Sequence, residues 1–292
     1  MIHPYLYLMV LPALLWFIIF SYLPMGGIVM AFQDFRPTRG FFESKWVGLK
    51  HFRLLFENTQ FWRAFNNTLI ISSLKLFFGF FTPVVLALLL NEIFNVRVKK
   101  TIQTILYLPH FLSWAIMAGI LTNLLGSDGT VNQVIKALGG QPVSIMANKD
   151  AFVPFLVITH VLKTMGWGSI IYIAAITGIN PTYYEAAVID GAGRFKQALY
   201  ITIPCILPTV TIMFILSVGG LVNAGFDQIF VLYNPSVQPV SDIIDTLVFR
   251  AGLQEAKHSY AAAAGLFKSV IGCALVIITN SVAKAAGGDS LF

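Results

Sequence analysis

Six long and nearly uninterrupted apolar runs are the feature of this sequence that most restricts its fold. A helix that crosses a bilayer needs about 20 mostly apolar residues, and every run reaches that length. The runs are continuous rather than alternating, which excludes a transmembrane β-barrel. Only 11% of the residues are charged, whereas about 25% is usual in a soluble domain. We therefore predict an all-α integral membrane protein, a single transmembrane domain over residues 1–292 with about six transmembrane helices near 5–32, 65–90, 102–125, 152–179, 201–222 and 260–283.

Lysine and arginine in short loops indicate the orientation, because cytoplasmic loops carry an excess of these residues. Such residues follow the second, fourth and sixth runs: Arg97, Lys99, Lys100, Arg194, Lys196 and Lys284. These three loops lie on one side, so we expect both termini in the cytoplasm. The segment 33–63 opposes this orientation, since it carries six basic residues on the predicted outer side. No basic stripe with interleaved aromatic residues is present, so the net charge of +6 indicates membrane lipid as a partner and no nucleic acid.

One segment between the fourth and fifth runs is charged and broken by glycine: "EAAVIDGAGRFKQALYITIPCILPT", residues 185–209. Asn180 suits a helix N-cap, and Pro181 suits the first helical position because its missing N–H would be unpaired there. The pattern predicts a short helix over 181–190, a left-handed stop at Gly191 and a second helix that merges into the fifth run. A ten-residue helix spans about 15 Å, too little to cross the bilayer. From the residues alone, the segment is either an ordinary polar loop or a helical plug for a groove on another protein.

The same segment resembles the EAA loop of bacterial ABC importer permeases. Its anchors are Glu185-Ala186-Ala187, then Gly191 after three residues, then Ile201-Thr202-Ile203-Pro204 after nine more, with Ile203 in place of the usual leucine. Four further stretches carry the resemblance: "YLMVLPALLWFIIFSYLPMGGIVMAFQDF", "FNNTLIISSLKLFFGFFTPVVLALLLNE", "GWGSIIYIAAITGINPTYYEAAVIDGAG" and "AAAAGLFKSVIG". Together they cover most of the chain. The protein is identified as a member of the polysaccharide-type permeases of carbohydrate importers, similar to the permeases of maltose importers and of alginate importers.

The resemblance implies a type I ABC importer permease fold in the bacterial cytoplasmic (inner) membrane. The segment 180–204 then holds a cytoplasmic coupling helix that seats in a cleft of an ATP-hydrolysing subunit. The expected partners are a second homologous permease subunit in a pseudo-twofold heterodimer, two ABC ATPase subunits, an extracytoplasmic solute-binding protein and an oligosaccharide substrate. The residues to which the resemblance assigns ATPase coupling are Glu185, Ala186, Ala187, Asp190 and Gly191.

The chain carries no nucleotide-binding loop of the form Gly-x-x-x-x-Gly-Lys-Ser/Thr, and "GAGRFK" at 191–196 has neither its spacing nor its context. We therefore expect a transport subunit rather than an enzyme. No cofactor is expected on this chain, and ATP and magnesium are expected on the partner ATPase.

Polar residues inside the runs are candidates for the transport pathway, because an ionisable group costs about 2.5–3.5 kcal/mol to insert at a helix centre. In the fourth run, four such residues share one helical face: His160, Lys163, Thr164 and Trp167. Lys75 lies on a similar polar face of the second run, Lys268 lies in the sixth, and Asn223 follows the fifth. These seven residues are the predicted substrate-pathway set.

The partners of the three lysines are not evident from the sequence, since no Asp or Glu lies within the core of any run. Each lysine must meet water, backbone carbonyls, acids of a partner subunit or an anionic substrate. Lysines near helix ends also extend to the headgroups, and polar bonds between helices are common in membrane proteins. Substrate contact and helix packing therefore both remain open for these residues.

Three classes of function compete. The leading hypothesis is a pore-forming subunit of an ATP-driven importer that moves oligosaccharides, including acidic ones such as alginate. An extracytoplasmic binding protein would deliver the oligosaccharide and would dock on residues 33–63, 127–150 and 223–257. The alternative is an ion-coupled secondary transporter, which would favour inverted repeats and intramembrane carboxylates; neither is found. An intramembrane enzyme is the third, and no HExxH, paired carboxylate or Gly-x-Ser-x-Gly supports it.

Overall fold

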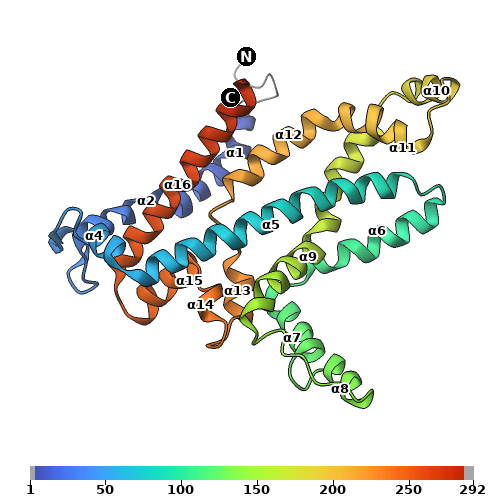
Figure 1. The fold of residues 1–292 in the computed structure, drawn as a ribbon. Helices are drawn as coiled ribbons and strands as arrows, with labels where there is room; N and C mark the ends of the chain where they lie inside the picture. The colour runs from blue at the N-terminus through green and yellow to red at the C-terminus, as the bar shows by residue number, and fades with distance from the viewer. Residues whose placement is uncertain (1–3, 286–292) are drawn as a thin grey trace. The chain divides into compact units, whose positions relative to one another are not determined.

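The computed structural model describes residues 4–285, and these residues are mostly helical, as predicted (Figure 1). The chain divides into two compact units: unit 1 contains Met1–Trp62 and Ile244–Ser269, and unit 2 contains Arg63–Ile243 and Val270–Phe292. Two long helices contribute residues to both units, α5 (Thr59–Asn91) and α16 (His258–Ala285).

Unit 1 combines the apolar N-terminal run with a short antiparallel ladder, in which Gln33 lies opposite Trp46. The ring of Phe32 stacks on that of Trp46 with centroids 5.8 Å apart, which fixes the end of the apolar run against the ladder. Its elements are α1 (Pro4–Phe17), a π-helical turn (Ile18–Tyr22), α2 (Leu23–Met25), a 3-10 segment (Gly26–Phe32), β1 (Gln33–Asp34), α3 (Gly40–Glu43), β2 (Lys45–Trp46), α4 (Lys50–Glu57), α15 (Ile244–Phe249) and a second π-helical turn (Arg250–Gln254).

Unit 2 is a group of helices around two buried apolar clusters. One cluster is centred on Phe152, Leu156 and Ile229, and the other on Tyr172 and Ile206. Besides parts of α5 and α16, the elements are α6 (Val96–Phe111), α7 (Trp114–Leu125), α8 (Thr130–Ala137), α9 (Lys149–Thr177), α10 (Pro181–Ile189), α11 (Arg194–Gln197), a π-helical turn (Ala198–Thr202), α12 (Ile203–Gly219), α13 (Phe226–Leu232) and α14 (Gln238–Ser241).

Helices α6 and α9 approach each other closely at Gly166. A Cβ atom at that position would lie 2.1 Å from the backbone oxygen of Leu106. Small residues at such contacts allow membrane helices to pack backbone against backbone. This contact places the polar face of α9 beside the end of α6.

Within the described residues, five helical segments are long and apolar enough to cross a membrane, and a bent pair would make a sixth. The bent pair occupies the third predicted run, where α6 and the helical segment that begins at Trp114 meet at 105°. Leu112 is extended at the bend, and the Ser113 hydroxyl caps α7 by accepting a hydrogen bond from the Ile116 N–H at 3.3 Å. Hydropathy alone does not reveal this break, because the residues on both sides of it are apolar.

The segment 223–257, expected to be an external loop, is instead built largely from α13, α14 and α15. Gly225 begins α13 with a left-handed backbone, φ +86°. Ile229 and Val237 of this segment are fully buried in unit 2. The turn after α12 therefore leads back into the protein rather than away from it.

Candidate transport pathway and coupling elbow

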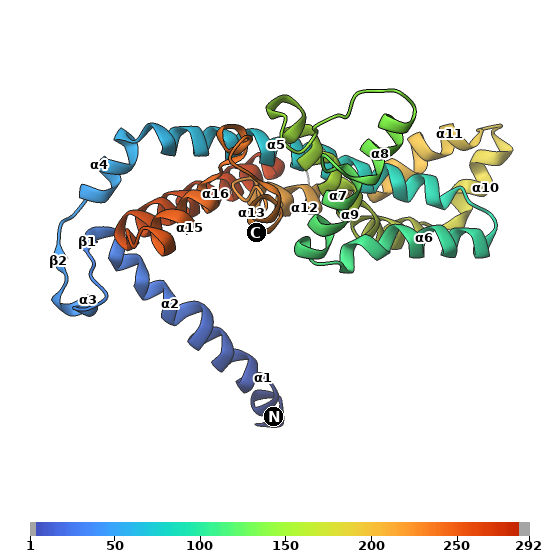
Figure 2. The same cartoon turned by 90° about the horizontal axis from the view of Figure 1, so that it is seen from below.

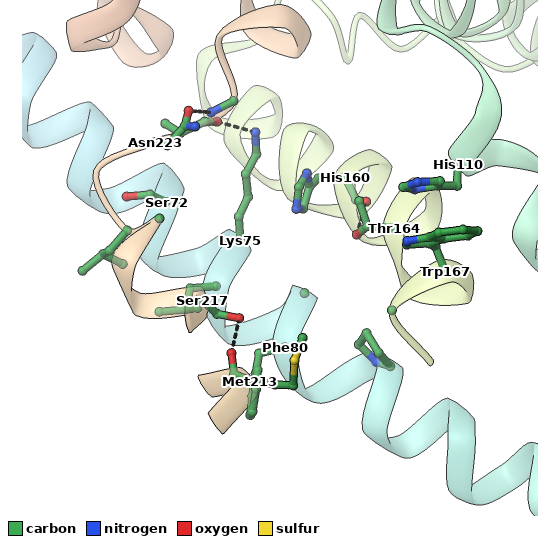
Figure 3. A pocket seen from close by; sticks show the side chains of 18 of the residues that line it. Ser72, Lys75, Phe80, His110, His160, Thr164, Trp167, Met213, Ser217 and Asn223 are labelled. Atoms are coloured by element: carbon green, nitrogen blue, oxygen red, sulfur yellow. Dashed lines mark hydrogen bonds between the residues drawn. The ribbon is translucent and has the colours of Figure 1, made fainter. Parts of the chain in front are cut away.

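Unit 2 contains a cavity of about 490 Å³, which we call the α5–α9 cavity, lined by α5, α9, the end of α6 and the connection from α12 to α13 (Figure 3). Five of the seven predicted pathway residues line it: Lys75, His160, Thr164, Trp167 and Asn223. The other two, Lys163 and Lys268, do not. The cavity is thus lined by residues from four of the apolar runs.

Lys75 lies in the wall of this cavity and is 5% exposed. Its ammonium group donates hydrogen bonds to the Ala224 carbonyl at 2.6 Å and to Oε1 of Gln228 at 2.5 Å. The Gln228 amide in turn donates to the Leu156 carbonyl at 2.8 Å and to Oγ1 of Thr159 at 2.9 Å. A charged group away from water is stabilised here by carbonyl dipoles. Lys75 therefore joins α5 to α9 through the turn that begins α13.

His160, Thr164 and Trp167 present the polar face of α9 to the cavity (Figure 3). The Thr164 hydroxyl donates to the His160 carbonyl at 2.9 Å. Trp167 stacks on His110, with centroids 4.7 Å apart and ring planes 2° from parallel. His110, at the end of α6, was not among the predicted residues. Its position one residue after Pro109, near the break in the third run, is the signal that would have drawn attention to it.

Lys163 binds the end of α6 at the break in the third run. It is 8% exposed, and its ammonium group donates to the carbonyls of Pro109, His110 and Leu112 at 3.1, 2.8 and 2.5 Å. The last carbonyls of a helix have no partner within the helix and must be paired elsewhere. The sequence left several kinds of partner open for Lys163, and the structure shows that its partners are backbone carbonyls.

Lys268 lies in unit 1 and contacts an acid. Its ammonium group is 2.5 Å from Oδ1 of Asp245, which belongs to α15. Asp245 lies between the fifth and sixth apolar runs, so a search for acids inside the runs does not find it. Lys268 is therefore part of a partly buried ion pair within this chain.

The segment 180–204 folds as the local signals predict, into an elbow of two short helices that we call the coupling elbow. Oδ1 of Asn180 accepts a hydrogen bond from the Thr182 N–H at 3.1 Å, and Pro181 begins α10. Gly191 ends it with φ +73°, and the Ala192 N–H donates to the Ala187 carbonyl at 2.8 Å. This is the helix stop that glycine favours.

Side-chain contacts hold the coupling elbow against its neighbours. The Tyr184 hydroxyl lies 2.8 Å from Oγ1 of Thr202, which connects α10 to the turn before α12. Arg194 lies 3.6 Å from Glu92 and 4.0 Å from the centroid of the Phe94 ring, both in the connection from α5 to α6. The elbow is thus connected to two of the apolar helices.

The coupling elbow exposes large apolar side chains beside its charged residues. Ile189 is 86% exposed and Phe195 is 82% exposed. Figure 1 shows α10 and α11 beyond the ends of α9 and α12. Of the predicted coupling residues, Ala187 is half-buried and the other four are exposed: Glu185, Ala186, Asp190 and Gly191. Large exposed apolar residues gathered on one surface are typical of a contact with another protein.

Across residues 4–285, no group of three or more His, Cys, Asp or Glu side chains is arranged to hold a metal ion. The α5–α9 cavity provides a cation, imidazoles, hydroxyls and an aromatic ring, which suit binding of a polar solute. Together with the apolar helices and the coupling elbow, this geometry defines a transport protein of the membrane.

The chain belongs to the family of inner membrane components of binding-protein-dependent transport systems, whose family model matches residues 79–286. Two relatives from Bacillus subtilis (strain 168) are each 42% identical over 289 residues, or 99% of this chain. They are protein LplB, of which 91% is covered, and the polygalacturonan/rhamnogalacturonan transport system permease protein YteP, of which 90% is covered.

Two solved structures are also similar. One is a bacterial ABC transporter involved in the import of the acidic polysaccharide alginate, with 40% identity, a TM-score of 0.88 and coverage of 96% of this chain and 95% of the other. The second is the bacterial alginate ABC transporter in complex with an alginate pentasaccharide-bound periplasmic protein, with 39% identity and the same TM-score.

The family resemblance and the permease fold predicted from the sequence are confirmed. The chain is a multi-pass permease subunit of an ABC importer of the inner membrane, a transport component rather than an enzyme. The ion-coupled alternative has no support from these relatives.

Proposed function

We propose that the whole chain acts as one permease domain, half of a translocation pore that imports acidic oligosaccharides. The observation that carries this proposal is the meeting of five predicted polar residues around one cavity, with the Lys75 side chain in its lining. The names of the similar permease and transporters, which refer to polygalacturonan, rhamnogalacturonan and alginate, support an acidic sugar as cargo.

The α5–α9 cavity has the size and chemistry for a sugar. Its volume of about 490 Å³ lies in the roughly 300–1,000 Å³ range of small-molecule sites. Trp167 provides an aromatic face, and Thr164 and Asn223 provide hydrogen-bonding groups. An ammonium group has three N–H donors, and two of those on Lys75 go to Ala224 and Gln228, which leaves one for a ligand.

Electrostatics favours an anionic cargo in this cavity. Opposite unit charges about 4 Å apart attract by roughly 4 kcal/mol at an effective dielectric of 20. A fraction of that energy, after the sugar loses water, is enough to prefer a uronate over a neutral sugar of equal length. His160 of α9 also lines the cavity, and its imidazole N–H can donate to a carboxylate.

The coupling elbow is the proposed contact with the ATPase. We place α10 in a cleft of that subunit, with Glu185, Ala186, Ala187, Asp190 and Gly191 at the contact and both chain termini in the cytoplasm. The complex would then contain a second permease, two ATPase subunits that hold ATP and magnesium, and an extracytoplasmic binding protein. The exposed Ile189 and Phe195 support a protein contact at this position.

Reconstitution tests this proposal. The chain is co-expressed with its companion permease and ATPase, purified and placed in liposomes with ATP inside, and the binding protein is added with trigalacturonate or maltotriose outside. We expect ATP-dependent uptake of trigalacturonate in preference to maltotriose. Uptake by this chain alone, driven by an ion gradient and independent of ATP, would contradict the proposal.

A further inference from the structure

Unit 1 contains a second polar hollow, which we call the unit 1 hollow and which shares no lining residue with the α5–α9 cavity. Its volume is about 510 Å³. It lies between β1, α4 and the turn that joins α15 to α16, elements that are adjacent in Figure 2. The charged and imidazole side chains that line it are Asp34, Lys50, His51, Arg250, Glu255, Lys257 and His258.

The lining carries charged side chains of both signs. Three permanent cations and two carboxylates contribute, and each carboxylate lies beside a lysine. Asp34 is 3.3 Å from Lys50, and Glu255 is 2.8 Å from Lys257. Arg250 also lines the hollow and has interactions of its own. An anion that enters the unit 1 hollow therefore meets cations from both α4 and the turn before α16.

The backbone of this turn is held in an unusual conformation. Ala256 has φ +54°, which is uncommon for a residue other than glycine. The π-helical turn precedes it, and the Lys257 N–H donates to the Ala251 carbonyl at 2.8 Å. Residues in such conformations persist where the surroundings impose them, and they concentrate at ligand sites. The backbone conformation at Ala256 places the next residue, Lys257, in the lining of the hollow.

The floor of the unit 1 hollow contains a polar atom without a partner. His51 is 7% exposed, and its Nε2 makes no hydrogen bond. The nearest acid oxygen, Oδ1 of Asp34, is 3.6 Å away. Buried side-chain nitrogens usually have a hydrogen-bond partner, so His51 is an exception among the residues that line the hollow.

The remaining lining residues are both polar and apolar, which suits the hydroxyl groups and C–H faces of a sugar. Asn58, Ser259 and Tyr260 supply hydrogen-bonding groups, and Phe35 and Leu54 supply apolar surface for the C–H faces of a ring. The hollow is built from two of the segments predicted to lie outside the membrane, 33–63 and 223–257, together with the start of α16.

We propose that the unit 1 hollow is a reception site for a uronic acid residue of the imported oligosaccharide, with Lys50 and Lys257 as the groups that bind its carboxylate. This proposal rests on the proposed function for the class of cargo and for the outer location. It adds a second sugar site on the chain, distinct from the α5–α9 cavity. The volume of the hollow lies in the usual range of small-molecule sites.

A local chemical readout tests the site. Cys205 and Cys273, both exposed, are replaced by serine, and Gln60 at the edge of the hollow becomes the single cysteine through Gln60→Cys. The assembled transporter in nanodiscs, without binding protein, is then treated with a thiol reagent. We expect digalacturonate to slow labelling and maltose not to do so. Lys50→Met or Lys257→Met removes a charge-assisted hydrogen bond to the carboxylate of the sugar. Either substitution should therefore raise the digalacturonate concentration that gives half-maximal protection about tenfold.

Arg53→Met is the matched control, because Arg53 is an exposed cation on the same helix that does not line the hollow. It should leave protection by digalacturonate unchanged. Equal protection by maltose, or no protection by either sugar, would overturn the proposal. Protection by the sugar-free binding protein alone would also overturn it and would identify the hollow as a docking surface. Liposome uptake of trigalacturonate by the wild-type complex, measured in parallel, reports on the proposed function separately.

Discussion

Lys75 of α5 donates a 2.5 Å hydrogen bond to Oε1 of Gln228 of α13, and the same ammonium group binds the carbonyl of Ala224 just before it. Lys163 similarly binds the carbonyls where α6 stops. Lys163 therefore lies where a membrane helix stops and its carbonyls need donors, whereas Lys75 binds the connection between α12 and α13. The bilayer core supplies no water for this purpose, so a buried lysine is one of the few groups that satisfy such an end.

Replacing Lys163 tests its role at the break. Lys163→Met leaves the carbonyls at the end of α6 without a donor, and an unsatisfied buried group costs about 1–3 kcal/mol. We expect a lower midpoint of thermal unfolding for the purified complex, with uptake per assembled complex largely retained. Lys136→Met is the control, since that side chain is 50% exposed and its ion pair contributes little. Unchanged unfolding with selective loss of trigalacturonate uptake would instead assign Lys163 to the pathway.

Replacing Lys75 tests the charge of the cavity. Lys75→Met should raise the KM for trigalacturonate about tenfold or more, because the cavity loses the lysine that can carry a positive charge in its lining. The readout is the ratio of trigalacturonate to maltotriose uptake in one preparation, which does not depend on how much complex assembles. An unchanged ratio would show that Lys75 only joins the helices.

Gly191 and Gly193 are two glycines of the coupling elbow that differ in backbone conformation. Replacing each of them distinguishes a requirement for the left-handed backbone at Gly191 from a general effect of substitution in this segment. Gly191 has φ +73°, where a β-branched residue is strained by about 1–3 kcal/mol. Gly193 has φ −69° and open space around the position of a Cβ. We expect Gly191→Val to abolish substrate-stimulated ATPase activity and uptake, and Gly193→Ala to preserve both.

Charge reversal probes the surface of the same elbow. Glu185→Lys places a cation on the exposed face of α10, so we expect insertion and permease pairing to persist while the ATPase no longer copurifies. Full copurification together with normal substrate-stimulated ATPase activity would remove Glu185 from the coupling contact.

The contact between α6 and α9 requires glycine. Gly166→Ala places a methyl group against the backbone oxygen of Leu106, and overpacking of this kind costs about 1–3 kcal/mol. We expect a lower thermal midpoint in detergent. Gly119→Ala in α7 is the control, because a Cβ there meets nothing within 4 Å. Equal midpoints for the two variants would contradict the close packing described here.

The pH dependence of stability should reflect His51. Burial lowers the pKa of His51 below its usual value, and Lys50 also lowers this pKa, while Asp34 and a backbone hydrogen bond to Gln33 raise it. Because the unfolded chain binds the proton more readily, the stability from neutral His51 is fully present above about pH 6.5 and is lost as the pH falls. We expect the thermal midpoint to fall between pH 7.5 and pH 5.5, and to fall less in His51→Gln. An equal fall in both proteins would exclude this cause.

Several features of the candidate pathway followed from the sequence because they depend on periodicity. Helical spacing placed His160, Thr164 and Trp167 on one face, and all three line the α5–α9 cavity. The same spacing included Lys163, which turns instead to the end of α6. A helical wheel groups residues within about 100° of each other, and it does not show where the neighbouring helix stops. His110 was missed for a related reason, because its role depends on stacking against Trp167 from another helix.

The sequence by itself determined the membrane class, the α-helical fold and the coupling elbow, because hydropathy, the Asn180 cap and the Gly191 stop act over a few residues. Only the tertiary structure decided the partners of the buried lysines and the existence of the unit 1 hollow. The hollow joins Asp34 and Lys50 to Lys257, about 200 residues further along the chain. Such meetings depend on how distant helices pack and where they break, and the energy of a buried charge depends on those neighbours rather than on the residues beside it in the chain.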